Sequence, residues 1–143
     1  MSTAVRRAIY GSLAGDTTLN DLLASPPSGY SKSIYHQQAP QGAEPPYVIF
    51  NRQTGTPIDS FGTPGALESD VWLVKAVTQG FSADTAEEIT ARVTTLLNDA
   101  SLSISGATLC GLRRVSDIEY PETANGVRYQ HAGSLYRLVT TPS

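Results

Sequence analysis

The sequence predicts an α+β fold: an antiparallel or mixed sheet of about four main strands, with one long helix and N-terminal helices packed on one face. Helical spacing of apolar residues occurs over residues 3–14 and 82–99. Strand-like alternation occurs over residues 67–78, 108–119 and 127–140. Because helices precede and interrupt runs of consecutive strands, the pattern is typical of α+β rather than of a parallel βαβ array.

The N-terminal region predicts two helices. Apolar residues in 3–14 recur on one helical face: Val5, Ala8, Ile9 and Leu13. Arg6 and Arg7 lie near the start of this helix, where the dipole disfavours cations, which indicates that they face a partner or solvent. Asp16 is placed to cap a second, short helical turn over residues 18–23.

The chain then enters the sheet through a proline-rich stretch. Ile34–Tyr35 reads as a brief strand, and Tyr47–Phe50 is a dense β-forming run. The prolines between them exclude a helix, because proline lacks the donor N–H and restricts the preceding residue to extended backbone conformations. Residues 52–65 are rich in glycine and proline, so we expect a long loop there.

Residues 67–78 predict a central strand, because both of its alternating faces are apolar. The helix expected over 82–99 has acidic residues in its first turn and an apolar stripe that faces the sheet. The core residues expected from these patterns are Tyr47, Ile49, Val71, Leu73, Ile89, Val93 and Leu96.

The C-terminal third predicts a long hairpin. A short strand is expected at 102–104, and the two hairpin strands are 108–119 and 127–140. The turn between them, Tyr120–Gly126, ends in the strong Asn-Gly signal. Gly133 interrupts the second strand, where we expect a bulge or a bend.

Composition bounds the function. The 143 residues suit a single domain, 1–143, and their formal net charge of −3 argues against broad binding to nucleic-acid phosphates. A single cysteine, Cys110, excludes an internal disulfide and gives no cysteine-rich metal framework. No run of about 20 apolar residues is present to span a bilayer. We therefore expect a protein without membrane contacts and without a cofactor.

His36 and His131, with Asp117 or Glu119, could form a metal site or an acid–base pair, and Cys110 could act as a nucleophile near His131, although a lone cysteine on a strand is more often a small buried residue. No close-spaced ligand motif supports it, so a small hydrolase using both histidines is the weakest alternative. Arginines on the expected hairpin offer a charged contact surface instead. Arg114 and Arg128 have the parity to share a sheet face, as does Arg137, although a solvated polar face with cross-strand acidic partners is the more common explanation for such arginines.

Short motifs in a consistent order along nearly the whole chain resemble the tail-completion, or tail-terminator, proteins of long-tailed bacteriophages and related tailed particles. The order and spacing carry the resemblance more than any one motif, and a longer stretch at 26–32 departs from the pattern. The motifs are Leu19–Leu23, Ile34-Tyr35, Ala39-Pro40, Pro45–Val48, Val71-Trp72, Phe81–Ala86, Leu96-Leu97, Arg128-Tyr129 and Tyr136-Arg137.

The resemblance implies a non-enzymatic structural protein of the virion neck, assembled in the host cytoplasm. Such proteins form a ring, usually a hexamer, at the head-proximal end of the tail tube. The ring ends tube polymerisation and meets the head–tail connector, while DNA passes through its lumen without sequence-specific binding. A head-closure adaptor of the same particle is the alternative. We expect the assembly contacts to include Ile58, Phe61, Arg114, Tyr120 and Arg128.

Overall fold

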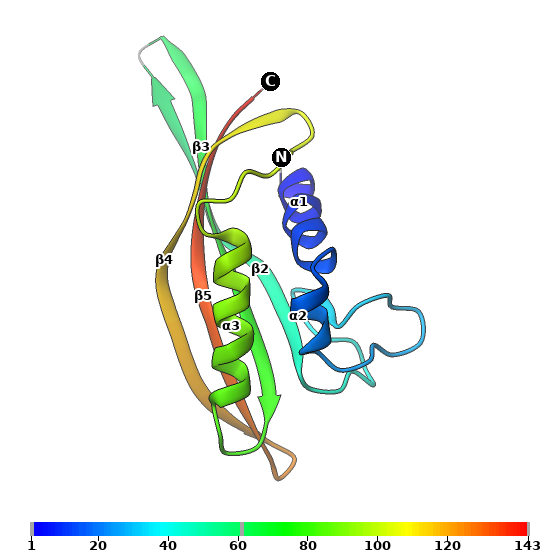
Figure 1. Cartoon of the computed structure of the whole chain (residues 1–143). Coiled ribbons are helices and arrows are strands. Elements are labelled where there is room, and N and C mark those ends of the chain that lie inside the picture. Colours follow the sequence, from blue (N-terminus) through cyan, green and yellow to red (C-terminus); the bar gives the residue numbers. More distant parts are fainter. Residues whose placement is uncertain (1, 61, 143) are drawn as a thin grey trace.

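The computed structural model describes residues 2–60 and 62–142, and confirms an α+β fold (Figure 1). Eight elements follow one another in the order expected from the sequence. They are α1 (Ser2–Ala14), α2 (Thr17–Asp21), β1 (Ile34–His36), β2 (Tyr47–Ser60), β3 (Thr63–Gln79), α3 (Asp84–Leu97), β4 (Ala107–Ala124) and β5 (Val127–Pro142).

The strands form one five-stranded mixed sheet in the order β1-β2-β3-β5-β4. β1 pairs with β2 in parallel, and the other neighbouring strands are antiparallel. The sequence prediction is imprecise in two details: the sheet has five strands, and α1 (13 residues) is nearly as long as α3 (14 residues). The short strand expected at 102–104 is wrong, because only an isolated bridge joins Ile104 to Ala107.

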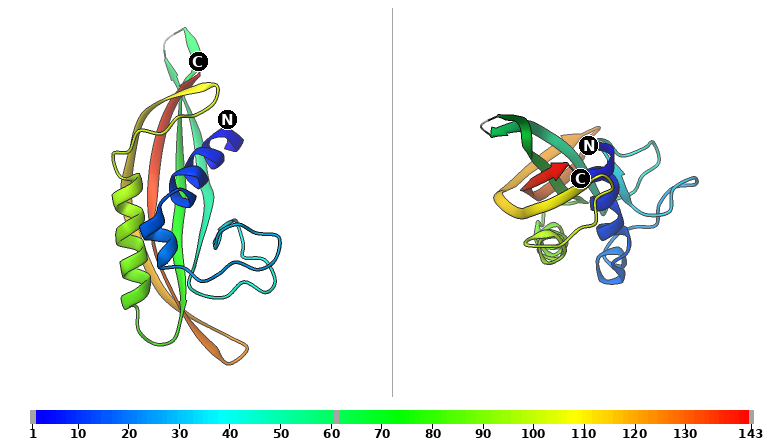
Figure 2. Two further views of the ribbon diagram at one scale, coloured as in Figure 1. Left: turned by 45° about the vertical axis from the view of Figure 1, so that its right-hand side comes forward. Right: turned by 90° about the horizontal axis from the view of Figure 1, so that it is seen from above.

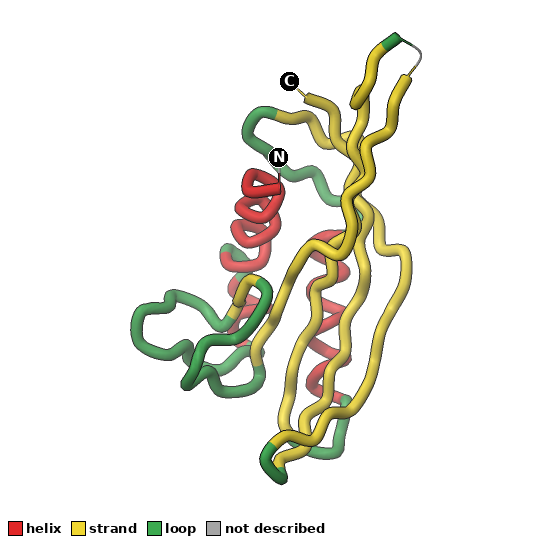
Figure 3. Tube along the Cα trace, turned by 180° about the vertical axis from the view of Figure 1, so that it is seen from behind, coloured by secondary structure: helices red, strands yellow, loops and turns green. Residues whose placement is uncertain are grey.

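All three helices cover the same face of the sheet (Figures 1 and 2). The view from behind shows the other face free of helices (Figure 3). Among the helices that the structure describes, none is long and apolar enough to cross a bilayer. The molecule is therefore two-layered, with a core between helices and sheet and a second sheet face without a covering layer.

The core uses the sheet parity opposite to the one expected for β2 and β3. Ile89 and Val93 are buried as predicted, and Leu96 is partly buried against the core. Ile49 is also buried, but it lies on the uncovered face, as do the partly buried Tyr47, Val71 and Leu73. The prediction failed because these strands are apolar on both faces, so alternation cannot say which one meets the helices. The helix-facing core residues of β2 and β3 are Val48, Phe50, Trp72, Val74 and Ala76.

Two hairpins project from opposite ends of the sheet (Figure 1). The loop expected at 52–65 is wrong, because β2 and β3 pair along this segment as far as Ser60 and Thr63. Residues Tyr120–Ala124 likewise belong to β4, which leaves Asn125 and Gly126 as the turn, both with positive φ. Pro57 and Pro121 are tolerated because β4, and β2 beyond its short pairing with β1, are edge strands, where a proline need not donate to a ladder.

Gly133 serves a purpose other than the expected bulge. The pairing of β5 with β3 is regular through Gly133, which lies opposite Lys75. A Cβ at position 133 would overlap the carbonyl oxygen of Val74 and the Cα of Lys75. The residue is therefore glycine because two backbones approach closely here.

Candidate assembly surfaces

The uncovered face of the sheet carries partly exposed apolar side chains along its centre. Leu73 of β3 lies directly opposite Leu135 of β5, and the next pairs along this face are Val71 with Arg137 and Ser69 with Val139. Ile118 of the edge strand β4 lies opposite Gly133 on this face. An apolar strip on a sheet face that no helix covers is a feature of protein contact surfaces.

Tyr120 lies on this uncovered face within a compact polar–aromatic cluster. Its ring stacks on that of His131, with centroids 4.5 Å apart and planes 8° from parallel. The ammonium of Lys75 donates a hydrogen bond of 2.8 Å to the Tyr120 hydroxyl. His131 Nε2 lies 2.9 Å from Glu122 Oε1. These contacts fix the orientation of Tyr120 while 40% of its surface remains exposed, as a preformed contact residue requires.

His131 makes stability depend on pH. Burial, aided by the positive charge of Lys75, holds the pKa of His131 below 6.5, although the hydrogen bond with Glu122 opposes this shift. The unfolded chain therefore binds more protons below pH 6.5. The stability associated with the neutral ring is present above pH 6.5 and is lost as pH falls through the lower folded-state pKa.

We expect His131→Phe, which keeps a ring against Tyr120, to flatten the fall of the melting temperature below pH 6.5. Thermal melts on both sides of that pH measure the slope. His36→Phe is the comparison variant, and we expect it to flatten the slope as well, because burial also lowers the pKa of His36. A His131→Phe variant with the full wild-type slope would contradict this assignment.

Ile58 lies on the β2 arm of the projecting β2–β3 hairpin, opposite Leu67, and 40% of its surface is exposed. Phe61 lies outside the described residues. The assembly role predicted for these two residues stays a prediction, and the structure places Ile58 on a hairpin rather than on the expected loop.

Arg114 and Arg128 share the helix-facing side of the hairpin but do not form one patch. Arg114 of β4 lies opposite Tyr136 of β5, whereas Arg128 lies on β5 itself. Tyr136 and Arg128 are eight residues apart, so roughly 27 Å of strand separates the two arginines. Arg114 Nη1 lies 3.3 Å from Asp117 Oδ1 at the edge of the sheet. The Arg128 guanidinium lies 4.9 Å from the centre of the Phe81 ring. Arg137 belongs to the other face, where its ladder partner is Arg113.

His36 and His131 do not form the shared site considered from the sequence. His36 pairs with Phe50 on the helix-facing side, and its ring packs 5.5 Å from Phe50 and 6.2 Å from Trp72. His131 lies on the uncovered face against Tyr120. Asp117 accepts a 2.7 Å hydrogen bond from Ser134 on the helix-facing side. Within residues 2–60 and 62–142, no three His, Cys, Asp or Glu side chains gather closely enough to hold a metal ion.

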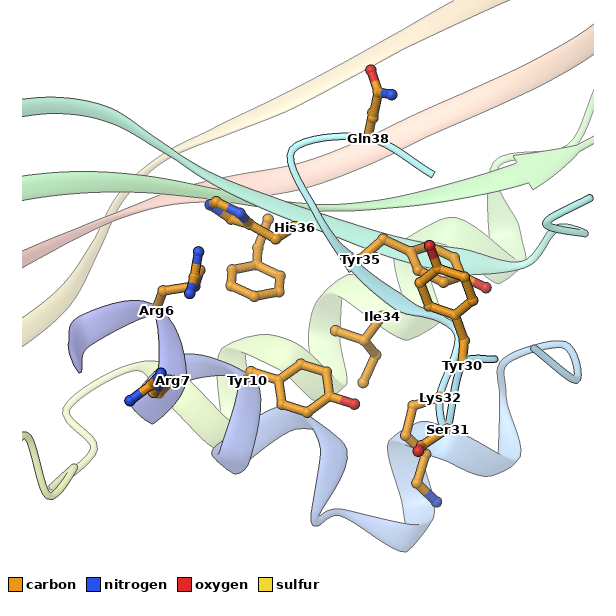
Figure 4. A pocket seen from close by; sticks show the side chains of 11 residues that line it. Arg6, Arg7, Tyr10, Tyr30, Ser31, Lys32, Ile34, Tyr35, His36 and Gln38 are labelled. Carbon is orange, nitrogen blue, oxygen red and sulfur yellow. The ribbon is translucent and has the colours of Figure 1, made fainter. Parts of the chain in front are cut away.

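A basic groove, which the sequence did not predict, lies between α1 and the segment that enters β1 (Figure 4). Its volume is about 470 Å³. Arg6 and Arg7 line one end and Lys32 the other, with Tyr10 and Ile34 between them (Figure 4). No carboxylate contributes to its described lining. The only sequence signal was the pair of arginines near the start of the first helix, which indicated a partner or solvent.

The positive charge of the groove does not come from His36. Burial, and then the positive charge of Arg6, lower the pKa of His36 below 6.5. His36 is therefore neutral near pH 7, and the charge of the groove comes from Arg6, Arg7 and Lys32. Aromatic rings, including the half-exposed Tyr30, supply apolar surface beside these cations. Such a lining suits an anionic group attached to an apolar or aromatic one.

Known proteins resemble this chain over nearly its whole length. Residues 7–139 match the family model described as tail completion protein gp17. A chain from the structure titled "Virion of native gene transfer agent (GTA) particle" superimposes with a TM-score of 0.70 and 19% identity, over 96% of this chain and 94% of that one. A second solved chain has a TM-score of 0.59 and 16% identity, over 96% and 95%. Among curated proteins, none matches.

Proposed function

Since the chain belongs to the tail completion protein gp17 family, we propose that it forms a ring at the head-proximal end of a tail tube and ends the tube's polymerisation. Family membership over residues 7–139 identifies a structural protein of a phage-like tail. The more specific proposal of a ring that ends the tube rests mainly on this match. The similarity to a chain of a gene transfer agent virion supports a place in such a particle.

The surfaces described above suit a ring subunit. In a closed ring each copy uses two different complementary surfaces, because the contact is head-to-tail. The chain has distinct features to offer: an uncovered apolar sheet face, two projecting hairpins and a basic groove. We propose that Ile58 and Tyr120 contribute to these contacts, because both are large side chains that remain 40% exposed on strands.

The proposed ring is hexameric, lies in the neck of the virion and forms in the host cytoplasm. Its partners are the tail tube protein on one side and the head–tail connector on the other. DNA passes through the lumen without sequence-specific binding, to which the net charge of −3 is suited, because a negative subunit does not retain the phosphate backbone. The role is structural and requires no cofactor.

Electron microscopy of particles made without this protein tests the proposal. We expect over-long tails that are not attached to heads, because nothing caps the growing tube. Expression of the chain in trans should restore attached tails of normal length, which excludes an effect on neighbouring genes. Tails of normal length beside filled heads that leak DNA would contradict tube termination and favour a head-closure adaptor.

A further inference from the structure

We propose that the basic groove of one copy receives Phe81 and the acidic start of α3 from the next copy in the ring. This inference rests on the ring proposed above and names one of its contacts. The two sites differ in charge and belong to different parts of the chain, as a head-to-tail interface requires.

The cations of the groove have no counterions within the subunit. Arg6, Arg7 and Lys32 make no ion pair with any residue in the described part of the chain. Arg52, Arg92, Arg113 and Arg114 each pair with a carboxylate, whereas Arg128 and Arg137 form no ion pair among the described residues. Arg6, Arg7 and Lys32 differ from these last two because they line one groove together. Three unpaired cations around an aromatic-lined groove, in a chain of net charge −3, form a local site for an anionic partner.

The segment that connects β3 to α3 has the complementary chemistry. Phe81 has 82% of its surface exposed, although Arg128 covers one side of its ring. The Phe81 carbonyl accepts a 3.2 Å hydrogen bond from Gln130 Nε2, so the segment is held in place. An aromatic ring that is both exposed and fixed is a suitable anchor for an interface.

Carboxylates follow Phe81 at the start of α3. Asp84, Glu87 and Glu88 are exposed, and none forms an ion pair with the described residues. The helix dipole favours acidic residues here, but the exposed side chains still present negative charge outward. Phe81 with these carboxylates therefore matches the aromatic and cationic lining of the groove.

The positions of the two sites allow a contact that repeats from copy to copy. The β3–α3 connection lies at the lower end of the molecule, whereas α1, which forms one wall of the groove, lies on the other side and higher (Figures 1 and 2). A subunit cannot fill its own groove with a segment so placed. Each copy can instead donate the segment to one neighbour and accept it from the other.

Charge reversal tests this contact in particles. Cells that make particles without the native protein receive a variant in trans, and the amount of the chain in purified particles is measured. Arg6→Glu with Arg7→Glu should lower incorporation at least about tenfold, because like charges then face each other across the contact. Adding Asp84→Lys and Glu88→Lys to the same chain should restore it. Phe81→Ser alone should also lower incorporation.

The matched control adds Asp21→Lys and Glu44→Lys to the Arg6→Glu, Arg7→Glu chain in place of Asp84→Lys and Glu88→Lys, because it restores the same net charge at exposed positions outside both sides of the contact and should not restore incorporation. Wild-type incorporation of the Arg6→Glu, Arg7→Glu variant would overturn the contact, and so would failure of the added Asp84→Lys and Glu88→Lys to restore it. In either case over-long tails in the absence of the protein would still support the proposed function. Tails of normal length in the absence of the protein would contradict the proposed function, independently of the results for the charge-reversal variants.

Discussion

Gly133→Ala is expected to destabilise the protein severely, by about 3 kcal/mol or more. The new Cβ would overlap the carbonyl oxygen of Val74 and the Cα of Lys75. These are backbone atoms of β3, the central strand, and no side-chain rotation relieves the contact. The β3–β5 pairing must therefore separate locally, and the hydrogen bonds around Gly133 weaken with it.

Urea unfolding of Gly133→Ala and Gly111→Ala measures this effect against a suitable control. Gly111 also lies in a strand, β4, but a Cβ there meets no atom within 4 Å. We expect Gly111→Ala to unfold near the wild-type midpoint. Equal midpoints for both variants would show that β3 and β5 accommodate a side chain at position 133.

The order of helices and strands could be predicted from the sequence, because each element shows in the local spacing of its apolar residues. Val5, Ile9 and Leu13 do lie on the buried face of α1, and the Asn125-Gly126 turn does close the hairpin. Strand ends were less predictable. Pro57 and Pro121 resemble loop residues, and their tolerance depends on both strands being at a sheet edge, which is a property of the whole topology.

The candidate surfaces were harder to predict because they depend on side-chain contacts between distant segments. The sequence predicts Tyr120 in a turn, whereas in the structure it lies on β4 and stacks on His131 of the neighbouring strand. The basic groove joins arginines of α1 to Lys32 through the packing of β1 beside the helix. No local pattern connects these positions, so only the fold brings their charges together.

Asp16 is expected to carry the largest electrostatic contribution to stability, because it joins α2 to α3. Its Oδ2 accepts hydrogen bonds from the Leu19 backbone N–H at 2.7 Å and from Arg92 Nε at 2.9 Å. Its Oδ1 accepts a third, from Arg92 Nη2 at 2.7 Å. The side chains of Asp16 and Arg92 are 15% and 31% exposed, so solvent screens the pair only in part.

We expect Asp16→Ala to lower the free energy of unfolding by about 2–4 kcal/mol near neutral pH, since it removes a helix cap and a bidentate ion pair together. Asp21→Ala, an exposed residue of α2, is the control and should change little. Denaturant unfolding gives both values. In a double-mutant cycle with Arg92→Met, strictly additive losses would contradict the coupling between the two side chains.

The same pair predicts how acid acts on the protein. The hydrogen bonds from Arg92 lower the pKa of Asp16 below 3.8, against an opposing effect of burial, and the Leu19 N–H adds to the lowering. Because the folded-state pKa is depressed, the contribution is fully present above pH 3.8 and is lost as pH falls through the folded-state value. The difference in stability between wild type and Asp16→Ala should therefore narrow only below pH 3.8. A difference that narrows between neutral pH and that value would place the dependence on another group.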